Sequence, residues 1–367
     1  MADIASSPPS PQSISPDAST IASTVAPGLT SGAAPAIASI DTGAACNNRC
    51  SVCPRPASAD SPAAPATAAD SEALAKLPGG TGAIVVHGGE PTLSPALEAI
   101  LRAARDAGRA LTLDTNARAF SVEGRALRLR QAGLAHAVIT LHGAREASHD
   151  FLTRTPGSFR QTVAGAMRLK AAGVRITARL IVTRTSALEL PAMATVALGL
   201  GAQAVRFSWA RMEARPGMPD LAAQNAEPKN DEKGVLRVDP NTPAGDREHY
   251  DQGREWLVPR YPLAEEALAA AVRAVQKVGR PVAVDGIPLC RVPAGAAVTP
   301  TAPTCATPGI SPAHAAGSDS VAAPDTFAPA CTDCTVRARC PGLPSGYFAR
   351  FGGSDLRPVL PAVASAT

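Results

Sequence analysis

Short apolar runs alternate with helical patterns along most of this chain, and the alternation constrains the fold more than any other feature. Glycine closes several of the helical patterns, as is typical of helix C-termini. Such an alternation indicates βα units around a parallel sheet. The predicted strands are residues 37–41, 82–87, 110–115, 137–142, 175–183 and 204–209, and the predicted helices between them are residues 95–107, 121–132, 158–172 and 189–200.

The number of units selects among the parallel-sheet folds. Six βα units are fewer than the eight of a closed (β/α)₈ barrel. We therefore expect an α/β fold, a partial (β/α)6 TIM-type barrel, in which a last helix at residues 263–278 leads to a further strand at 281–285.

Proline, alanine, serine and threonine gather in segments that lack this periodicity. The chain has 35 prolines but only 3% aromatic and 18% charged residues, a composition that suggests that part of it builds no core of its own. Residues 54–80 and 294–330 are such segments within the chain, and residues 212–251 are a polar, turn-rich insertion. We expect a disordered tail at residues 1–35, the barrel at 36–280, a small cysteine-rich extension at 281–355 and a second tail at 356–367.

Charge and hydropathy narrow the range of partners. A formal net charge of +4 without a block of lysine or arginine argues against a nucleic-acid partner. No uninterrupted apolar stretch of about 18 residues is present, and the first residues lack the pattern of a secretory signal, so we expect no membrane partner and a cytoplasmic location. The cytoplasm is reducing, so we expect the eight cysteines to be metal ligands or catalytic groups and not to form disulfides.

Three of the cysteines directly follow the first predicted strand. Cys46, Cys50 and Cys53 have the spacing C-x3-C-x2-C. Iron–sulfur cubanes usually take four thiolates, so three ligands leave one iron open to a substrate or cosubstrate. The loop after a barrel strand lies at the face where such folds build active sites. Zinc binding, or three inert thiols, is the alternative reading of the spacing.

A second motif, Gly88-Gly89-Glu90, follows the second predicted strand. Together the two motifs resemble the radical S-adenosylmethionine (SAM) superfamily, with its three-cysteine loop and its GGE segment. The resemblance implies a [4Fe–4S] cluster that binds the amino and carboxylate groups of SAM and cleaves it to a 5′-deoxyadenosyl radical. It also implies that Gly88, Gly89 and Glu90 contact the amino group of the cosubstrate, glycine allowing close approach of the backbone.

Further positions match the family with less specific motifs. Thr140 matches its Ser/Thr contact to the cosubstrate, and Asn116 matches its TNG segment. Val52 departs from the aromatic residue usual beside the third cysteine, which leaves cluster binding intact because that residue mainly offers backbone to the adenine.

Three other polar residues near the predicted mouth have open roles. His142 and His149 either line a substrate cavity or hold loops by hydrogen bonds. Arg179, on the fifth predicted strand, points either inward to a carboxylate or outward to water.

The second cysteine group, Cys331, Cys334 and Cys340, has the spacing C-x2-C-x5-C and resembles SPASM and twitch extensions, which bind auxiliary [4Fe–4S] clusters. Pro344 stands where the family pattern has another cysteine, which favours one auxiliary cluster. The resemblance makes Cys290 the expected fourth ligand, and Cys305 is left as a spare thiol or a substitute for it. A zinc site with four thiolates is the alternative.

The resemblance favours an enzyme that modifies a precursor peptide or protein, with an electron donor such as flavodoxin or ferredoxin. Radical chemistry on a small metabolite or cofactor precursor is the first alternative. A non-catalytic iron–sulfur electron-transfer protein is the second, and the intact GGE segment speaks against it.

Overall fold

The computed structural model describes residues 37–53, 83–210, 254–298 and 326–360, all of which belong to one compact unit, Ala36–Thr367. The predicted tail at 1–35, the segments 54–80 and 212–251, and Cys305 lie outside the described residues. No helix in the described ranges has the length and apolar character needed to cross a bilayer.

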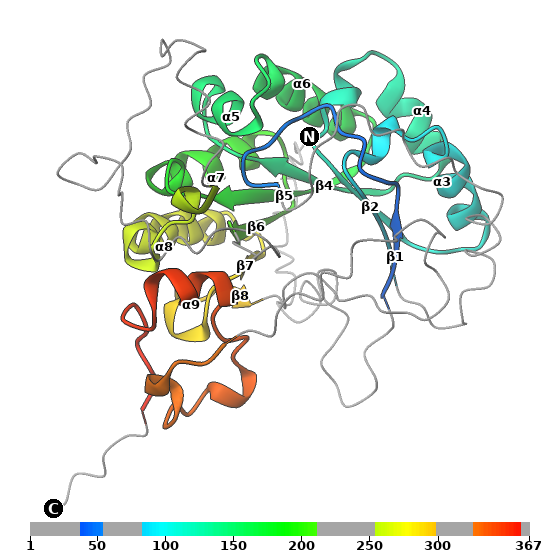
Figure 1. Cartoon of the computed structure of the whole chain (residues 1–367). Coiled ribbons are helices and arrows are strands. Elements are labelled where there is room, and N and C mark those ends of the chain that lie inside the picture. Colours follow the sequence, from blue (N-terminus) through cyan, green and yellow to red (C-terminus); the bar gives the residue numbers. More distant parts are fainter. Residues whose placement is uncertain (1–36, 54–82, 211–253, 299–325, 361–367) are drawn as a thin grey trace, which may run out of the picture. The chain divides into compact units, whose positions relative to one another are not determined.

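A single parallel sheet forms the centre of the fold (Figure 1). Its strands follow one another in chain order, and every neighbouring pair is parallel. Within the described residues β1 and β8 are the two edges, so the barrel is open there. The strands are β1 (Ile37–Asp41), β2 (Ala83–His87), β3 (Leu111–Thr115), β4 (His136–Leu141), β5 (Arg175–Val182), β6 (Ala204–Trp209), β7 (Val282–Asp285) and β8 (Ala297–Val298).

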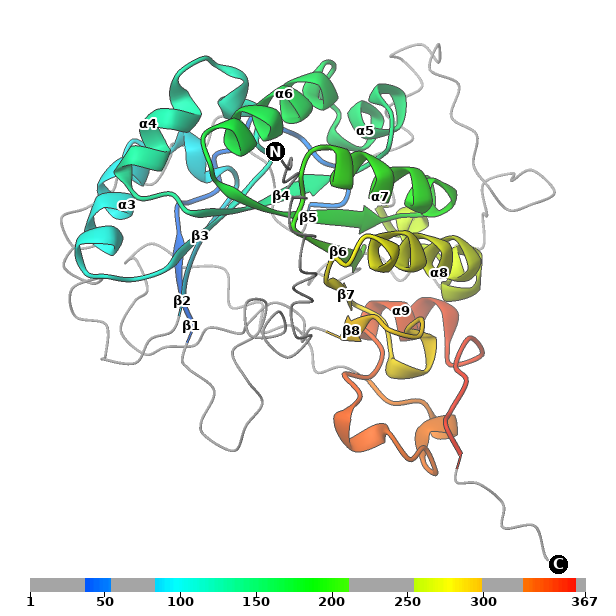
Figure 2. The same ribbon diagram turned by 180° about the vertical axis from the view of Figure 1, so that it is seen from behind.

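Helices cover the outer face of this sheet, and the view from behind shows α7 and α8 side by side (Figure 2). Several of them present apolar residues to the strands, such as Leu97 and Ile100 on α3 or Leu268 and Val272 on α8. The helices are α3 (Leu97–Asp106), α4 (Arg125–Ala132), α5 (Glu146–Thr153), α6 (Ser158–Ala171), α7 (Leu190–Gly199), α8 (Tyr261–Lys277) and α9 (Ser345–Phe351).

The predicted α/β barrel is confirmed, since β1 to β6 lie at the six predicted strands. The structure adds three elements that the periodicity did not reveal, α5, β8 and α9, all too short for a strong repeat. It also shortens the predicted helix at 121–132. A 3-10 turn occupies Arg118–Ser121, and α4 begins only after Gly124, whose φ of 76° lies in the left-handed region.

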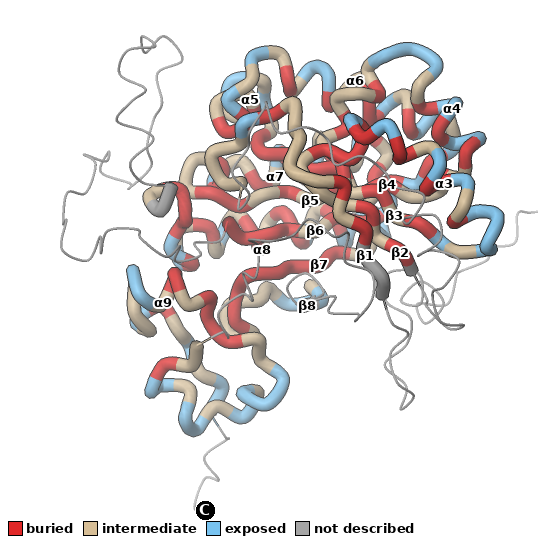
Figure 3. The backbone as a smooth tube through the Cα atoms, turned by 45° about the vertical axis from the view of Figure 1, so that its right-hand side comes forward, coloured by how far each residue is buried: buried red, intermediate tan, exposed pale blue. Residues whose placement is uncertain are grey.

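Burial alternates along the central strands (Figure 3). In β5 the buried residues Ile176 and Leu180 belong to the hydrophobic core, while Thr177 and Arg179 between them are only half-buried. Side chains of a strand point alternately to its two faces. One face of the sheet therefore packs against the helices, and the other carries polar groups into the interior of the barrel.

The C-terminal segment is anchored to α8 through aromatic and ionic contacts. Tyr347 of α9 stacks on Tyr261 with ring centroids 4.1 Å apart, and its hydroxyl oxygen accepts the Tyr261 backbone N–H at 2.9 Å. The same hydroxyl donates to Asp355 at 2.6 Å, and Arg260 donates to both oxygens of that carboxylate at 2.6 and 3.1 Å. These contacts fix residues 326–360 against the first turn of α8.

Candidate metal centres

The loop that carries the first cysteines follows β1 directly and is bound to the segment after β2. The Thr42 N–H donates to the carbonyl of His87 at 2.8 Å. The N–H groups of Gly89 and Glu90 donate to the carbonyls of Gly43 and Ala45, each at 2.7 Å. The Gly88-Gly89-Glu90 segment therefore extends the β1–β2 ladder into the loop and supports the residues just before Cys46.

Both glycines of that segment are required by close packing. A Cβ at Gly89 would lie 2.3 Å from the carbonyl oxygen of Ala45 and 2.4 Å from that of Ala44. Gly88 has φ of 153°, and a Cβ there would lie 2.5 Å from Thr42 Oγ1. Real Cβ atoms do not approach backbone so closely, so a side chain at Gly89 would push the cysteine loop away.

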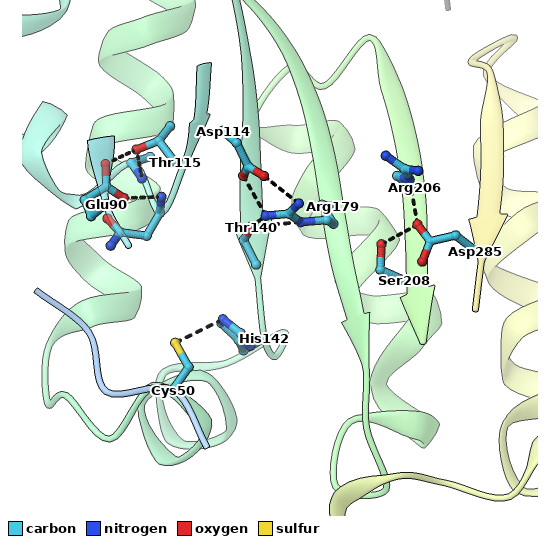
Figure 4. Close-up of polar contacts among 12 residues, drawn as sticks. Cys50, Glu90, Asp114, Thr115, Thr140, His142, Arg179, Arg206, Ser208 and Asp285 are labelled. Carbon is cyan, nitrogen blue, oxygen red and sulfur yellow. Dashed lines mark hydrogen bonds and ion pairs between the residues drawn. The ribbon is translucent and has the colours of Figure 1, made fainter. Parts of the chain in front are cut away.

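Glu90 is buried and acts as a hub beneath the loop (Figure 4). Its Oε1 accepts from the Thr92 backbone N–H at 3.1 Å and from the hydroxyls of Thr92 and Thr115 at 2.6 and 2.7 Å. Its Oε2 accepts the Asn116 N–H at 2.7 Å. Burial raises the pKa of this carboxyl group, and the hydrogen bonds oppose that shift.

Asn116, predicted at the mouth, is tied to the cysteine loop by its side chain. Its Nδ2 donates to Asn47 Oδ1 at 2.7 Å. Arg118, which the sequence reading did not single out, donates from Nη1 to Asn48 Oδ1 at 2.8 Å and to the Asn47 carbonyl, and from Nε to Gln161 at 2.7 Å. Burial lowers the pKa of this guanidinium, and the neighbouring Cys46 opposes that shift.

The first two thiols lie in partly buried positions. The Asn48 N–H points to Cys46 Sγ at 3.4 Å, and burial raises the pKa of the Cys46 thiol to about 11. Burial also raises the pKa of the Cys50 thiol far above its usual range, and the charges of Cys53 and Cys46 raise it further. All three cysteines lie on the one loop that follows β1. Since metal ligands must be deprotonated, binding a metal here would release protons.

The interior face of β3 to β7 carries two ion pairs (Figure 4). Arg179 on β5 contacts both oxygens of Asp114 on β3, and it donates to Thr140 Oγ1 on the strand between them at 2.7 and 3.1 Å. On the next strands Arg206 Nε lies 2.6 Å from Asp285 Oδ2, which also accepts from the Ser208 hydroxyl at 2.8 Å. Arg179 therefore points inward, and Thr140 is oriented by it.

Both histidines after β4 are buried. His142 Nε2 lies 3.5 Å from Cys50 Sγ, and the His142 backbone N–H donates to His149 Nδ1 at 3.3 Å. Their rings meet edge to face with centroids 5.5 Å apart. Of the two roles left open by the sequence, the structure gives His149 the loop-holding one, and it places His142 beside a predicted cluster ligand.

The four cysteines predicted for the extension line a single pocket, together with Phe327, Arg337 and Leu343. Cys340 Sγ faces the N–H groups of Leu289 and Gly342 at 3.3 and 3.4 Å, and Cys290 Sγ faces that of Arg357 at 3.5 Å. Burial raises the pKa of the Cys290 thiol. The fold thus brings Cys290, Cys331, Cys334 and Cys340 together from segments separated in the sequence.

In the part of the chain that is described, no three or more His, Cys, Asp or Glu side chains are grouped so as to hold a single metal ion. All seven described cysteines are free thiols.

Comparison with known proteins agrees with the loop and sheet described above. Residues 40–188 match the family model of the Radical SAM superfamily. An AdoMet-dependent heme synthase from Methanosarcina barkeri is 28% identical over 175 residues, which are 47% of this chain and 49% of that protein. The chain therefore spans about half the length of this curated relative.

Solved structures show distant likenesses. anSMEcpe with bound AdoMet and the Kp18Cys peptide is 15% identical with a TM-score of 0.47, covering 68% of this chain and 63% of that one. Streptococcus suis SuiB is 13% identical with a TM-score of 0.43, covering 68% and 49%. SuiB bound to the precursor peptide SuiA is 17% identical with a TM-score of 0.40, covering 47% and 39%.

Proposed function

We propose that this chain is a radical SAM enzyme that modifies a peptide or protein substrate. In this proposal Cys46, Cys50 and Cys53 hold a [4Fe–4S] cluster within a barrel at residues 36–280, and residues 281–355 form an auxiliary-cluster extension. We expect the enzyme to work in the cytoplasm with a flavodoxin or ferredoxin as its electron donor.

One observation carries the proposal: the cysteine loop, the GGE segment and the segment after β3 form one hydrogen-bonded assembly. The backbone N–H groups of Gly89 and Glu90 donate to carbonyls of the loop. The side chains of Asn116 and Arg118 donate to the two asparagines of the loop, Asn47 and Asn48. The donor set also fits an iron–sulfur cluster, since three thiols on one loop, one of them facing a backbone N–H, are the ligands that such clusters take.

When bound, the cluster supplies the electron that cleaves SAM to methionine and the 5′-deoxyadenosyl radical, which takes hydrogen from the substrate. The chain itself supplies position and charge. Glu90 offers a buried carboxylate to the cosubstrate's amino group, and Asn116 and Thr140 offer polar groups at the ends of β3 and β4. Arg179 and Asp114 keep the Thr140 hydroxyl in one orientation.

For the extension we propose an auxiliary [4Fe–4S] cluster held by Cys290, Cys331, Cys334 and Cys340. The pocket that these four side chains line supports it. A zinc site needs four ligands within about 2.3 Å of one ion. Zinc bound by the same four thiolates is the alternative, and metal analysis of the purified protein separates the two.

A second candidate function is radical chemistry on a small metabolite or cofactor precursor. The likeness to an AdoMet-dependent heme synthase favours it, because that relative's name describes the synthesis of a small cofactor. The peptide proposal draws support from the cysteine-rich extension, whose four cysteines line one pocket.

The test of the core proposal is anaerobic reconstitution followed by reduction with dithionite in the presence of SAM. We expect about eight irons per chain, four for each cubane, charge-transfer absorption, and formation of 5′-deoxyadenosine. Cys50→Ala should abolish that product, and Cys334→Ala should spare it. Persistent cleavage in Cys50→Ala, or a zinc-only protein, contradicts the proposal.

The substrate class is tested separately with the same preparation. Deuterium from a labelled precursor peptide encoded beside the gene should appear in 5′-deoxyadenosine if the peptide proposal holds. Transfer from a labelled tetrapyrrole precursor instead would establish the metabolite alternative.

A further inference from the structure

His142 is the buried polar residue that the proposed chemistry leaves without a role. It follows β4, and its ring is 6% exposed. Its Nε2 lies 3.5 Å from Cys50 Sγ, a contact that joins positions 92 residues apart in the chain (Figure 4). Its Nδ1 is buried without a hydrogen-bond partner. Of the two ring nitrogens, only the one that faces the sulfur has a polar contact in the structure.

The ring is held in that position from behind. His149, 1% exposed, accepts the His142 backbone N–H and meets its ring edge to face. His149 itself packs on Phe159 with ring centroids 5.4 Å apart. The imidazole of His142 is therefore wedged between a packed aromatic group and the cysteine loop, and it cannot turn away from Cys50 without opening the core.

The chemistry of the contact fixes which group donates. A cysteine sulfur bound to iron carries no proton, so a hydrogen bond to it needs an N–H on the partner. Nε2 is the ring nitrogen that faces the sulfur, at 3.5 Å, so the donating N–H must lie on that nitrogen. Hydrogen bonds to the sulfurs and the solvent exposure of a cluster set its reduction potential.

We propose that His142 is a positioning residue for the first cluster: its Nε2–H donates a hydrogen bond to the Cys50 sulfur and thereby raises the reduction potential of that cluster. A donor near the sulfur stabilises the reduced, more negative cluster more than the oxidised one. The proposal rests on the function proposed above, because it needs Cys50 to be a cluster ligand.

The test is a redox titration of the reconstituted full-length protein, followed by electron paramagnetic resonance. The signal of the first cluster is the one that changes when SAM is added. His142→Leu removes the donor, and we expect the equilibrium constant for one-electron reduction to fall about tenfold, a shift of about 59 mV to lower potential. His142→Gln, whose side-chain N–H reaches a similar position, should restore most of the wild-type potential.

His136→Leu is the matched control. His136 begins the same strand, and its ring nitrogens contact Thr112 and Thr177 at 3.0 and 2.9 Å instead of a cysteine. We expect this variant to keep the wild-type potential. An equal shift in His136→Leu, or no shift in His142→Leu at full iron content, overturns the proposal.

A variant that fails to fold or to bind the cluster is replaced by a second one. If His142→Leu does not assemble the cluster, His142→Asn, too short to reach Cys50, takes its place and should show the same lowered potential. An unshifted potential in that variant also overturns the inference. A wild-type protein that binds no SAM-responsive cluster overturns the proposed function with it, whereas equal potentials overturn the role of His142 alone.

Discussion

Arg179 and Asp114 form a two-point ion pair that spans the strand between them, with N–O distances of 2.7 and 2.6 Å. Arg179 lies on β5 and Asp114 on β3, and Thr140 of β4 accepts from the same guanidinium. Three neighbouring strands are thus joined on the interior face of the sheet, where the side chains are only partly exposed.

Breaking this pair should destabilise the protein. Asp114→Asn removes the charge that compensates Arg179, and hydrogen bonds to charged groups contribute about 1.5–3 kcal/mol each, so we expect the free energy of unfolding to fall by about 2 kcal/mol. Urea denaturation of the metal-free protein measures it. Asp106→Asn is the control, since Asp106 pairs with Arg105 at the surface of α3. A similar fall in unfolding free energy in both variants would show that the interior ion pair stabilises the protein no more than the surface pair does.

Gly89→Ala should displace the cysteine loop without unfolding the barrel. The added Cβ meets two backbone carbonyl oxygens of the loop, and neither can move unless the loop shifts. We expect reconstituted iron to fall by about half, one cubane of the two, with the circular dichroism spectrum unchanged. Gly199→Ala is matched to it, because a Cβ there meets nothing within 4 Å. That variant should keep its full iron content, and iron loss in both would refute the steric explanation.

Arg118→Gln should make the first cluster easier to remove. The substitution deletes the contacts from Arg118 to Asn47 and Asn48, so the loop loses two of its hydrogen bonds, although the one from Asn116 to Asn47 remains. Outer contacts of metal ligands are typically worth about 10–100-fold in metal affinity, and we expect at least tenfold faster iron release to a chelator. Arg102→Gln, at an exposed pair with Glu98 on α3, should release iron at the wild-type rate. Identical rates in both variants would mean that Arg118 does not support the loop.

Iron analysis of variants should show which cysteines bind the auxiliary cluster: the four of the pocket, or Cys305 in place of one of them. Cys290→Ala should lower the iron content from about eight to about four per chain, as expected for loss of one cubane, and should leave SAM cleavage in place. Cys305→Ala should bind the full amount. The reverse pattern would assign the fourth ligand to Cys305.

The anchor of the extension should weaken in acid. Asp355 is partly desolvated, which raises its pKa, but hydrogen bonds from Arg260 and Tyr347 outweigh burial, so the pKa of this carboxyl is lowered on folding. A lowered pKa contributes stability that is present above the unfolded value of about 3.9 and is lost as pH falls through the folded value. The difference in unfolding free energy between wild type and Asp355→Asn should therefore be constant from pH 7 to about pH 5 and shrink below about pH 4. A difference that does not change below about pH 4 would contradict this expectation.

Much of the fold is predictable from the sequence because its elements repeat. Each βα unit has an apolar strand and an amphipathic helix long enough to show their periods, and β1 to β6 appear where these periods place them. Short elements escaped prediction. α5 is held by Ser148, whose hydroxyl donates to Glu189 at 2.7 Å, and α9 is held by Tyr347 on α8. Their stability comes from contacts that no local pattern encodes.

The candidate site divides in the same way. The spacing of Cys46, Cys50 and Cys53 and the GGE segment are visible in the chain because their chemistry depends on close neighbours in sequence. The clamp by Arg118 and the approach of His142 to Cys50 are not, since each joins residues about 70 to 90 positions apart. The sequence signals that could have revealed the clamp were Arg118, which directly follows the Asn116 motif, and the two asparagines between the first cysteines, Asn47 and Asn48.

The sequence by itself determined the βα order, the two cysteine groups and the loops that carry them, because each depends on residues adjacent along the chain. Only the tertiary structure decided that Arg179 points inward to Asp114, that His142 faces a cysteine sulfur, and that Cys290 shares a pocket with Cys331, Cys334 and Cys340. These depend on strand register and on how the extension packs against α8. A shift of one residue in register would turn every such side chain to the opposite face of the sheet.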